Sequence, residues 1–206
     1  MNKPNIRSFD RYQELARRTQ NPHLDRQGKL AHAALGLCSE VAEVETACRT
    51  GDVDSIVGEI GDVFWMLSEL CDALGLRMQT ILTDLILISD AEDEMEARRN
   101  DKFAPHPIRD HFGFHEMSLA AATIAGYVQK TFQGHPISPE RIAPVICTLY
   151  VHLRLKASYY GFSVFHAMYQ NIEKLKARYP EGFSEDRSIH RKELEEIKNK
   201  EGKING

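Results

Sequence analysis

The sequence predicts an all-α protein, a helical bundle, and three observations favour that fold class. Apolar residues recur at spacings of three and four, which is the period of one helix face. Proline and glycine gather at a few breaks, whereas strands would be separated by turn residues at short, regular intervals. The chain of 206 residues is also long enough to bury a substantial apolar core.

The first half of the chain predicts a series of helices. A short helix covers about 9–19, and a long one covers about 27–50. Asp52 or Asp54 can cap a third helix, which Gly75 ends. The second and third helices each carry an apolar stripe, and these stripes should pack together: Leu30, Ala34, Leu37, Val41, Val44 and Cys48, and Ile56, Ile60, Val63, Leu67, Leu70 and Leu74.

A change of composition near the middle of the chain suggests a boundary. Another helix begins near Met78, and the highly charged segment 90–99 is typical of an exposed helix end. Two prolines and a glycine within 103–114 favour a connection. We therefore expect three parts, namely a first unit over 1–102, a second unit over 103–185 and a charged tail over 186–206.

Two acidic pairs at helical spacing, Glu40-x-x-Glu43 and Glu59-x-x-Asp62, are the strongest functional signal. Residues three apart share a helix face, and like charges there cost about 0.2–0.5 kcal/mol per pair. A divalent cation would remove that repulsion, and carboxylate oxygens are the ligands that Mg²⁺ prefers. We expect all four acids to be metal ligands, with one free to orient or deprotonate water. Taken alone, each pair would more often be a solvated helix face, but both pairs border apolar stripes at matching spacing, which favours the metal site.

An internal duplication is the next expectation. Residues 35–51 match residues 118–134 in their small, apolar and terminal glycine positions. In that alignment the second copy has lost all four acids. Further along, it contains Asn171, Lys174 and Arg178. One half would then supply the acids and the other half the cations of a single composite site.

Composition excludes several classes of protein. A net charge of −4 with intermixed Lys and Arg argues against nucleic-acid binding. No apolar run reaches the length of a membrane span, and the first ten residues lack a secretory signal. Because the cysteines show no C-x-x-C spacing, we expect buried free thiols and a cytoplasmic protein: Cys38, Cys48, Cys71 and Cys147.

Residues 36–76, with Glu40-Val-Ala-Glu43 followed by Gly58-Glu59-Ile-Gly-Asp62, resemble the all-α nucleoside triphosphate pyrophosphohydrolases of the MazG type. The dimeric dUTPases belong to the same superfamily. The resemblance implies Mg²⁺-dependent hydrolysis, with Mn²⁺ as an alternative ion, of the bond between the α- and β-phosphates of a nucleoside triphosphate. The products would be a nucleoside monophosphate and pyrophosphate, a reaction that cleanses nucleotide pools.

The resemblance is uneven along the chain. It implies a bundle of two MazG-like units, of which the second is degenerate. Family units are usually about half as long, and here residues 93–157 separate the two matching motifs. Ser39 and Gly58 stand where many members carry a further acid, which leaves the number of bound ions open.

Five residues are candidates for substrate binding. Lys174 and Arg178 are four apart and could clamp triphosphate oxygens, and Asn171 lies one turn earlier. This segment resembles the closing helix of the family. Trp65 could stack on a nucleobase, and Lys29 could approach phosphate. An ordinary surface helix and a packed aromatic side chain are the alternatives for these residues.

The leading hypothesis is therefore a Mg²⁺-dependent pyrophosphohydrolase that acts on NTPs or dNTPs, forms a homo-oligomer, most simply a homodimer, and binds neither nucleic acid nor membrane. A non-catalytic nucleotide-binding or regulatory helical protein derived from the same family is the alternative. A third hypothesis is a metal-free helical interaction module. Neither the preferred base and sugar nor the water-activating carboxylate is predicted by the sequence.

Overall fold

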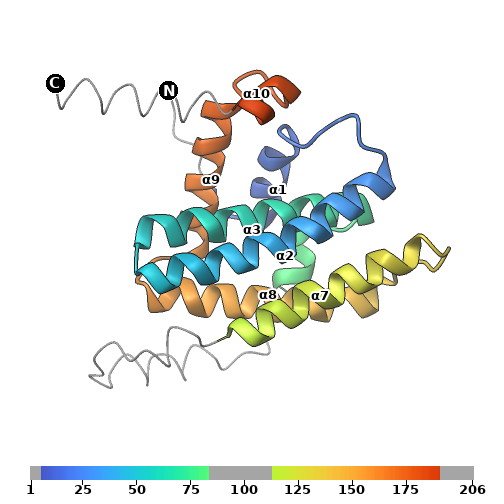
Figure 1. Ribbon diagram of the computed structural model, residues 1–206, viewed down its shortest axis with the longest axis horizontal. Helices are drawn as coiled ribbons and strands as arrows, with labels where there is room; N and C mark the ends of the chain where they lie inside the picture. Colours follow the sequence, from blue (N-terminus) through green and yellow to red (C-terminus); the bar gives the residue numbers. More distant parts are fainter. Residues whose placement is uncertain (1–5, 84–112, 191–206) are drawn as a thin grey trace.

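The computed structural model describes residues 6–83 and 113–190, and all regular structure within these ranges is α-helical (Figure 1). The expected fold class is thus confirmed. The helices are α1 (Phe9–Arg17), α2 (Arg26–Thr50), α3 (Val53–Leu74), α4 (Met78–Thr83), α7 (Phe114–Thr131), α8 (Pro139–Tyr159), α9 (Val164–Arg178) and α10 (Glu185–His190). The predicted helix end at 90–99, nearly all of the predicted connection at 103–114 and most of the predicted tail lie outside the described residues.

Helices α2 and α3 begin and end where their local chemistry dictates. The Asp25 side chain caps α2 by accepting a hydrogen bond from the backbone N–H of Gly28, at 2.7 Å. Asp52, one of the two expected candidates, caps α3. Gly51 and Gly75 end the two helices, each with φ of 71°, a left-handed conformation that glycine adopts without strain.

The expected packing of the two apolar stripes is confirmed. Helices α2 and α3 run antiparallel and side by side (Figure 1). Leu37 and Val41 of α2 and Ile60 and Leu67 of α3 are fully or almost fully buried. Burying a large aliphatic side chain contributes about 1.5–3 kcal/mol, so this seam is a principal source of stability.

The remaining helices enclose this hairpin. Helices α7 and α8 form a second hairpin, and α7 packs along α2 (Figure 1). Helices α1 and α9 both pack on α3. Buried side chains from both halves form one continuous core. Helix α3 is therefore central, and its polar side chains can be reached from α2, α1 and α9.

The proposed duplication stays a prediction, although four glycines fit it. Gly134 and Gly161, which correspond to Gly51 and Gly75 in the alignment of the two halves, also have left-handed φ values, of 85° and 83°. Each half contains a helical hairpin, α2–α3 and α7–α8. The boundaries between the expected parts are not tested by this arrangement.

The cysteines depart from expectation at one position. All four are free, and Cys48, Cys71 and Cys147 are buried, but Cys38 is exposed. Within the described ranges, no helix combines the length and the apolar character that crossing a bilayer requires.

Candidate metal centre

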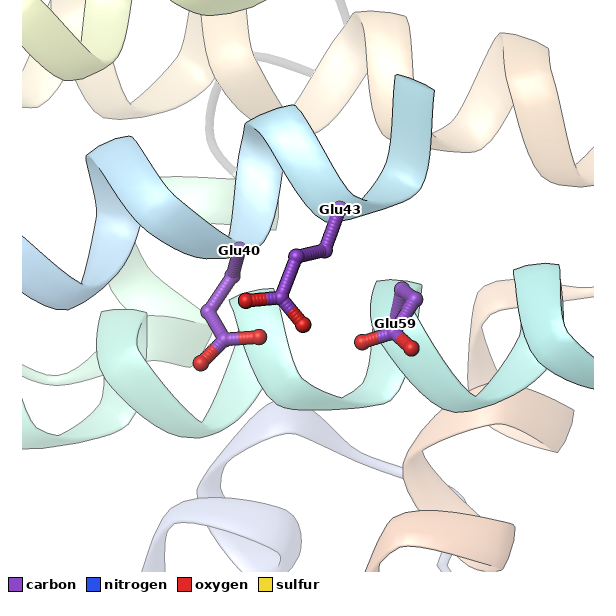
Figure 2. A group of neighbouring side chains, drawn as sticks. All are labelled: Glu40, Glu43 and Glu59. Carbon is purple, nitrogen blue, oxygen red and sulfur yellow. The ribbon is translucent and has the colours of Figure 1, made fainter. Parts of the chain in front are cut away.

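Helices α2 and α3 bring three of the four predicted acids together. Glu40, Glu43 and Glu59 each place one carboxylate oxygen within 4.8 Å of the others. Figure 2 shows Glu40 and Glu43 reaching from α2 toward α3, which carries Glu59. Glu40 and Glu59 are half-buried, whereas Glu43 is exposed. A cluster of three carboxylates from two helices can hold a hard divalent cation.

The acids are one end of a polar seam between the antiparallel helices. Four positions along this face of α2, taken toward its N-terminus, lie next to positions on α3. The facing pairs are Glu43 with Glu59, Glu40 with Asp62, Gly36 with Met66, and His32 with Glu69. From Glu43 to His32 the seam therefore spans about three helical turns of α2.

Burial and repulsion from neighbouring acids raise the pKa of two of these carboxylates, Glu40 and Glu59. Burial, followed by the charges of Asp62, Glu43 and Glu59, raises the pKa of Glu40 to about 7. Burial and the charges of Asp62 and Glu43 likewise raise the pKa of Glu59. The Lys174 ammonium opposes both shifts. A bound cation would relieve the same repulsion, so this donor set fits Mg²⁺ in both chemistry and charge.

The fourth acid, Asp62, is held from the other half of the chain. Lys174 of α9 donates to both of its carboxylate oxygens, with Nζ 2.7 Å from Oδ1. Asn171 donates to Oδ1 from Nδ2, also at 2.7 Å. These two residues were predicted to contact substrate, and in this structure they contact Asp62. The expected meeting of acids and cations from the two halves thus takes place at a single carboxylate.

Tyr12 of α1 extends this network and was not predicted. Its fully buried hydroxyl donates to Oδ1 of Asn171, at 2.8 Å. Burial, and then the charge of Asp62, raises the pKa of Tyr12 well above its ordinary value, so the hydroxyl stays protonated. Asn171 is itself only 1 % exposed, and its amide is fixed at both ends. The sequence pattern places Tyr12 on the apolar face of a short helix and gives no indication of its hydrogen bond.

Close approach of α9 to α3 depends on Gly61. A Cβ atom at this position would lie 2.8 Å from Cβ of Asn171 and 2.9 Å from the carbonyl oxygen of Ala167, closer than van der Waals contact allows. The absence of a side chain at Gly61 therefore lets α9 place Asn171 and Lys174 beside Asp62.

The other predicted residues lie on the same three helices as the acids and Lys174. Arg178 is half-buried, one turn beyond Lys174 on α9. Trp65 is half-buried on α3, and its Nε1 donates to Oγ1 of Thr19 at 2.9 Å. Lys29 is in the first turn of α2, about 16 Å along the helix axis from Glu40. It is therefore not part of the acid cluster.

A surface cavity of about 390 Å³ lies elsewhere, between α1 and the end of α3. Its polar residues bind one another. Arg17 donates from Nη2 to Oδ1 of Asp72, and Arg77 pairs with Asp10. The cavity contains none of the four acids, and we assign it no role.

Comparison of the chain with models of known protein families, with curated proteins and with solved structures found no match.

Proposed function

We propose that this protein is a Mg²⁺-dependent nucleoside triphosphate pyrophosphohydrolase. The observation that supports this most is the convergence of Glu40, Glu43 and Glu59 within 4.8 Å, beside a fourth acid that has its own cationic partner. Such a site combines cation ligands with positive charge for phosphate. The resemblance of the two acidic motifs to the MazG-type enzymes supports the same reaction.

In this proposal Glu40, Glu43 and Glu59 would hold the ion, Mg²⁺ or Mn²⁺, and Asp62 completes the acid set. When bound, the ion would neutralise phosphate charge and make a water molecule more acidic. Lys174 is 35 % exposed, so its ammonium group can turn from Asp62 to an arriving phosphate oxygen. Arg178, on the same face of α9, adds a second cation at the i+4 position.

The reaction balances as a simple hydrolysis. The oxygen of water bonds to the α-phosphorus, and the bond from that phosphorus to the oxygen that bridges it to the β-phosphorus breaks. The nucleoside monophosphate keeps the new oxygen, and pyrophosphate leaves with the bridging oxygen. A carboxylate of the acid set accepts the proton of the water. We further propose a homodimer and, because the four thiols are free, a reducing compartment such as the cytoplasm.

The test is the release of pyrophosphate and monophosphate from a panel of NTPs and dNTPs, with Mg²⁺ or with EDTA. We expect Mg²⁺-dependent release, and a loss of at least about 100-fold in kcat for Glu43→Gln, because one ligand of the cluster becomes neutral. Glu45→Gln is the matched control, since Glu45 lies on the same helix but binds Arg49 at 2.6 Å.

Two outcomes would contradict the proposal. Release that persists in EDTA would exclude a metal-dependent reaction. Nucleotide binding without any product would favour the non-catalytic alternative.

A further inference from the structure

Glu69 is a buried carboxylate that the acid cluster does not use. Its side chain is 0 % exposed, and Oε2 lies 2.5 Å from Nδ1 of His32. The other oxygen, Oε1, has no hydrogen-bond partner among the residues that the structure describes. An ionised carboxylate costs several kcal/mol to bury unless it is paired, so a buried acid with one unpartnered oxygen is a candidate functional group.

His32 connects this buried charge to the surface. Its side chain is 46 % exposed, and its Nδ1 is engaged by Glu69. The imidazole ring meets the Trp65 ring edge to face, with centroids 6.0 Å apart. The hydrogen bond to Glu69 raises the pKa of His32. Because Nδ1 faces the Glu69 carboxylate, Nε2 is the ring nitrogen left for a ligand, and it is an N–H donor when the ring carries both protons.

The position of His32 relative to the acids indicates which part of a nucleotide it would contact. His32 precedes Glu40 by two turns on one face of α2, about 12 Å along the axis. Gly36 lies between them, where a Cβ atom would meet Sδ of Met66 at 2.3 Å. The apolar thioether of Met66 therefore packs directly on Gly36, within the seam between the acids and the imidazole. An extended nucleotide with its phosphates at the acids would place its base near His32.

Building on the pyrophosphohydrolase activity proposed above, we propose that His32, Glu69 and Trp65 form the nucleobase subsite, in which Nε2–H of His32 donates to a keto oxygen of the base. Glu69 acts as a positioning residue, because it fixes the ring and keeps it charged. Trp65 supplies an aromatic surface beside the base. The subsite favours 4-oxopyrimidines and 6-oxopurines over their amino counterparts, whose N–H groups would face another donor.

Trp65 is the chain's single tryptophan, so its fluorescence can report base binding without hydrolysis. The full chain is titrated with UMP and CMP, with IMP and AMP, and with ribose 5-phosphate. We expect quenching by the nucleotides, with UMP and IMP binding about tenfold more tightly than CMP and AMP. Ribose 5-phosphate, which lacks a base, should give no quenching.

Three variants separate recognition from folding. His32→Ala should abolish the preference for oxo bases, whereas the matched control His115→Ala, at an exposed position on α7, should retain it. Glu69→Gln keeps an acceptor for Nδ1–H but removes the charge. His32 then becomes neutral and Nε2 becomes an acceptor, so the preference should shift toward CMP and AMP. A role in packing alone would not produce that shift, and Glu69→Gln remains informative if His32→Ala does not fold.

Equal binding of the oxo and amino nucleotides by the wild-type protein, or an unchanged ranking in both site variants, would overturn the subsite. Hydrolysis assays on the same proteins keep the two proposals apart. Base discrimination without pyrophosphate release contradicts the activity but supports the subsite. Pyrophosphate release that is indifferent to the base and to His32 supports the activity and contradicts the subsite.

Discussion

At the scale of single residues, the distinctive feature of this site is an acid that already has a cation. Lys174 and Asn171 hold Asp62 through three hydrogen bonds, while Glu40, Glu43 and Glu59 place their carboxylates close to one another. Charge-assisted hydrogen bonds of this kind are about twice as strong as neutral ones. Asp62 is therefore fixed before any ion or substrate binds.

Replacing Lys174 should have opposite effects on the binding of Mg²⁺ and of the nucleoside triphosphate. In Lys174→Met we expect tighter Mg²⁺ binding, because the ammonium no longer repels the ion or competes for Asp62. The KM for the nucleoside triphosphate should rise by about tenfold or more, since a phosphate partner is lost. Isothermal calorimetry with Mg²⁺ and steady-state kinetics measure the two effects.

Lys176→Met is the control for this experiment, because Lys176 is on the same helix and binds Glu173 at 3.1 Å. Weaker Mg²⁺ binding in Lys174→Met would show that the lysine organises the acids more than it competes with the ion.

At the scale of elements, the sequence predicted the acidic half of the site and not its partner contacts. The spacing of Glu40 and Glu43 places both on one face of α2, and that of Glu59 and Asp62 places both on one face of α3. Two amphipathic helices joined by a glycine turn have few ways to pack. That Asn171 binds Asp62 depends on how α9 crosses α3, which local periodicity does not encode. The partnership of Tyr12 with Asn171 depends on the same crossing.

Two glycines on α3 test the importance of that crossing. Gly61→Ala should destabilise the protein and weaken nucleotide binding, because its Cβ atom would force α9 away from Asp62. Gly58→Ala, less than one turn earlier, meets nothing within 4 Å and should instead stabilise the protein by about 0.5–1 kcal/mol through helix propensity. Urea unfolding measures the stability of both variants. An unchanged free energy of unfolding in Gly61→Ala would show that α9 can shift without loss of stability.

At the scale of the whole molecule, the acid cluster should set the pH dependence of stability. The pKa of Glu40 rises from 4.5 to about 7 on folding, so the native state retains a proton that the unfolded state releases. Stability without metal should therefore fall as pH rises from about 5 to about 7, and then level off. His32, whose pKa is also raised, acts in the same direction because its stabilisation is lost as it deprotonates.

Saturating Mg²⁺ should reverse that trend, because the ion binds the ionised carboxylates and stabilises only the native state. Urea unfolding at pH 5.5, 6.5 and 8, with EDTA or with Mg²⁺, measures the effect. The stabilisation by Mg²⁺ should be largest at pH 8 and smaller in Glu40→Gln. A stability that rises with pH in EDTA would contradict the assigned cause.

The bundle also shows which global features the sequence could specify. One continuous core with no strand in the described ranges follows from helical periodicity along the chain. The exposure of Cys38 does not follow, because it depends on which helix faces remain uncovered after α3 and α7 have packed on α2. The burial of Glu69 and its contact with His32 depend on neighbouring helices in the same way, and the sequence shows only an acid on a helix.

The pairing of Asp62 with α9 also joins residues that are synthesised at different times. Asp62 meets Asn171 and Lys174 across 109 and 112 positions of the chain. At a translation rate of about 5–20 residues per second, the acids leave the ribosome about 5–20 s before the lysine that holds one of them. Until α9 has been synthesised, Asp62 cannot form these hydrogen bonds. Synthesis of α9 is therefore the step at which a growing chain can first complete this network.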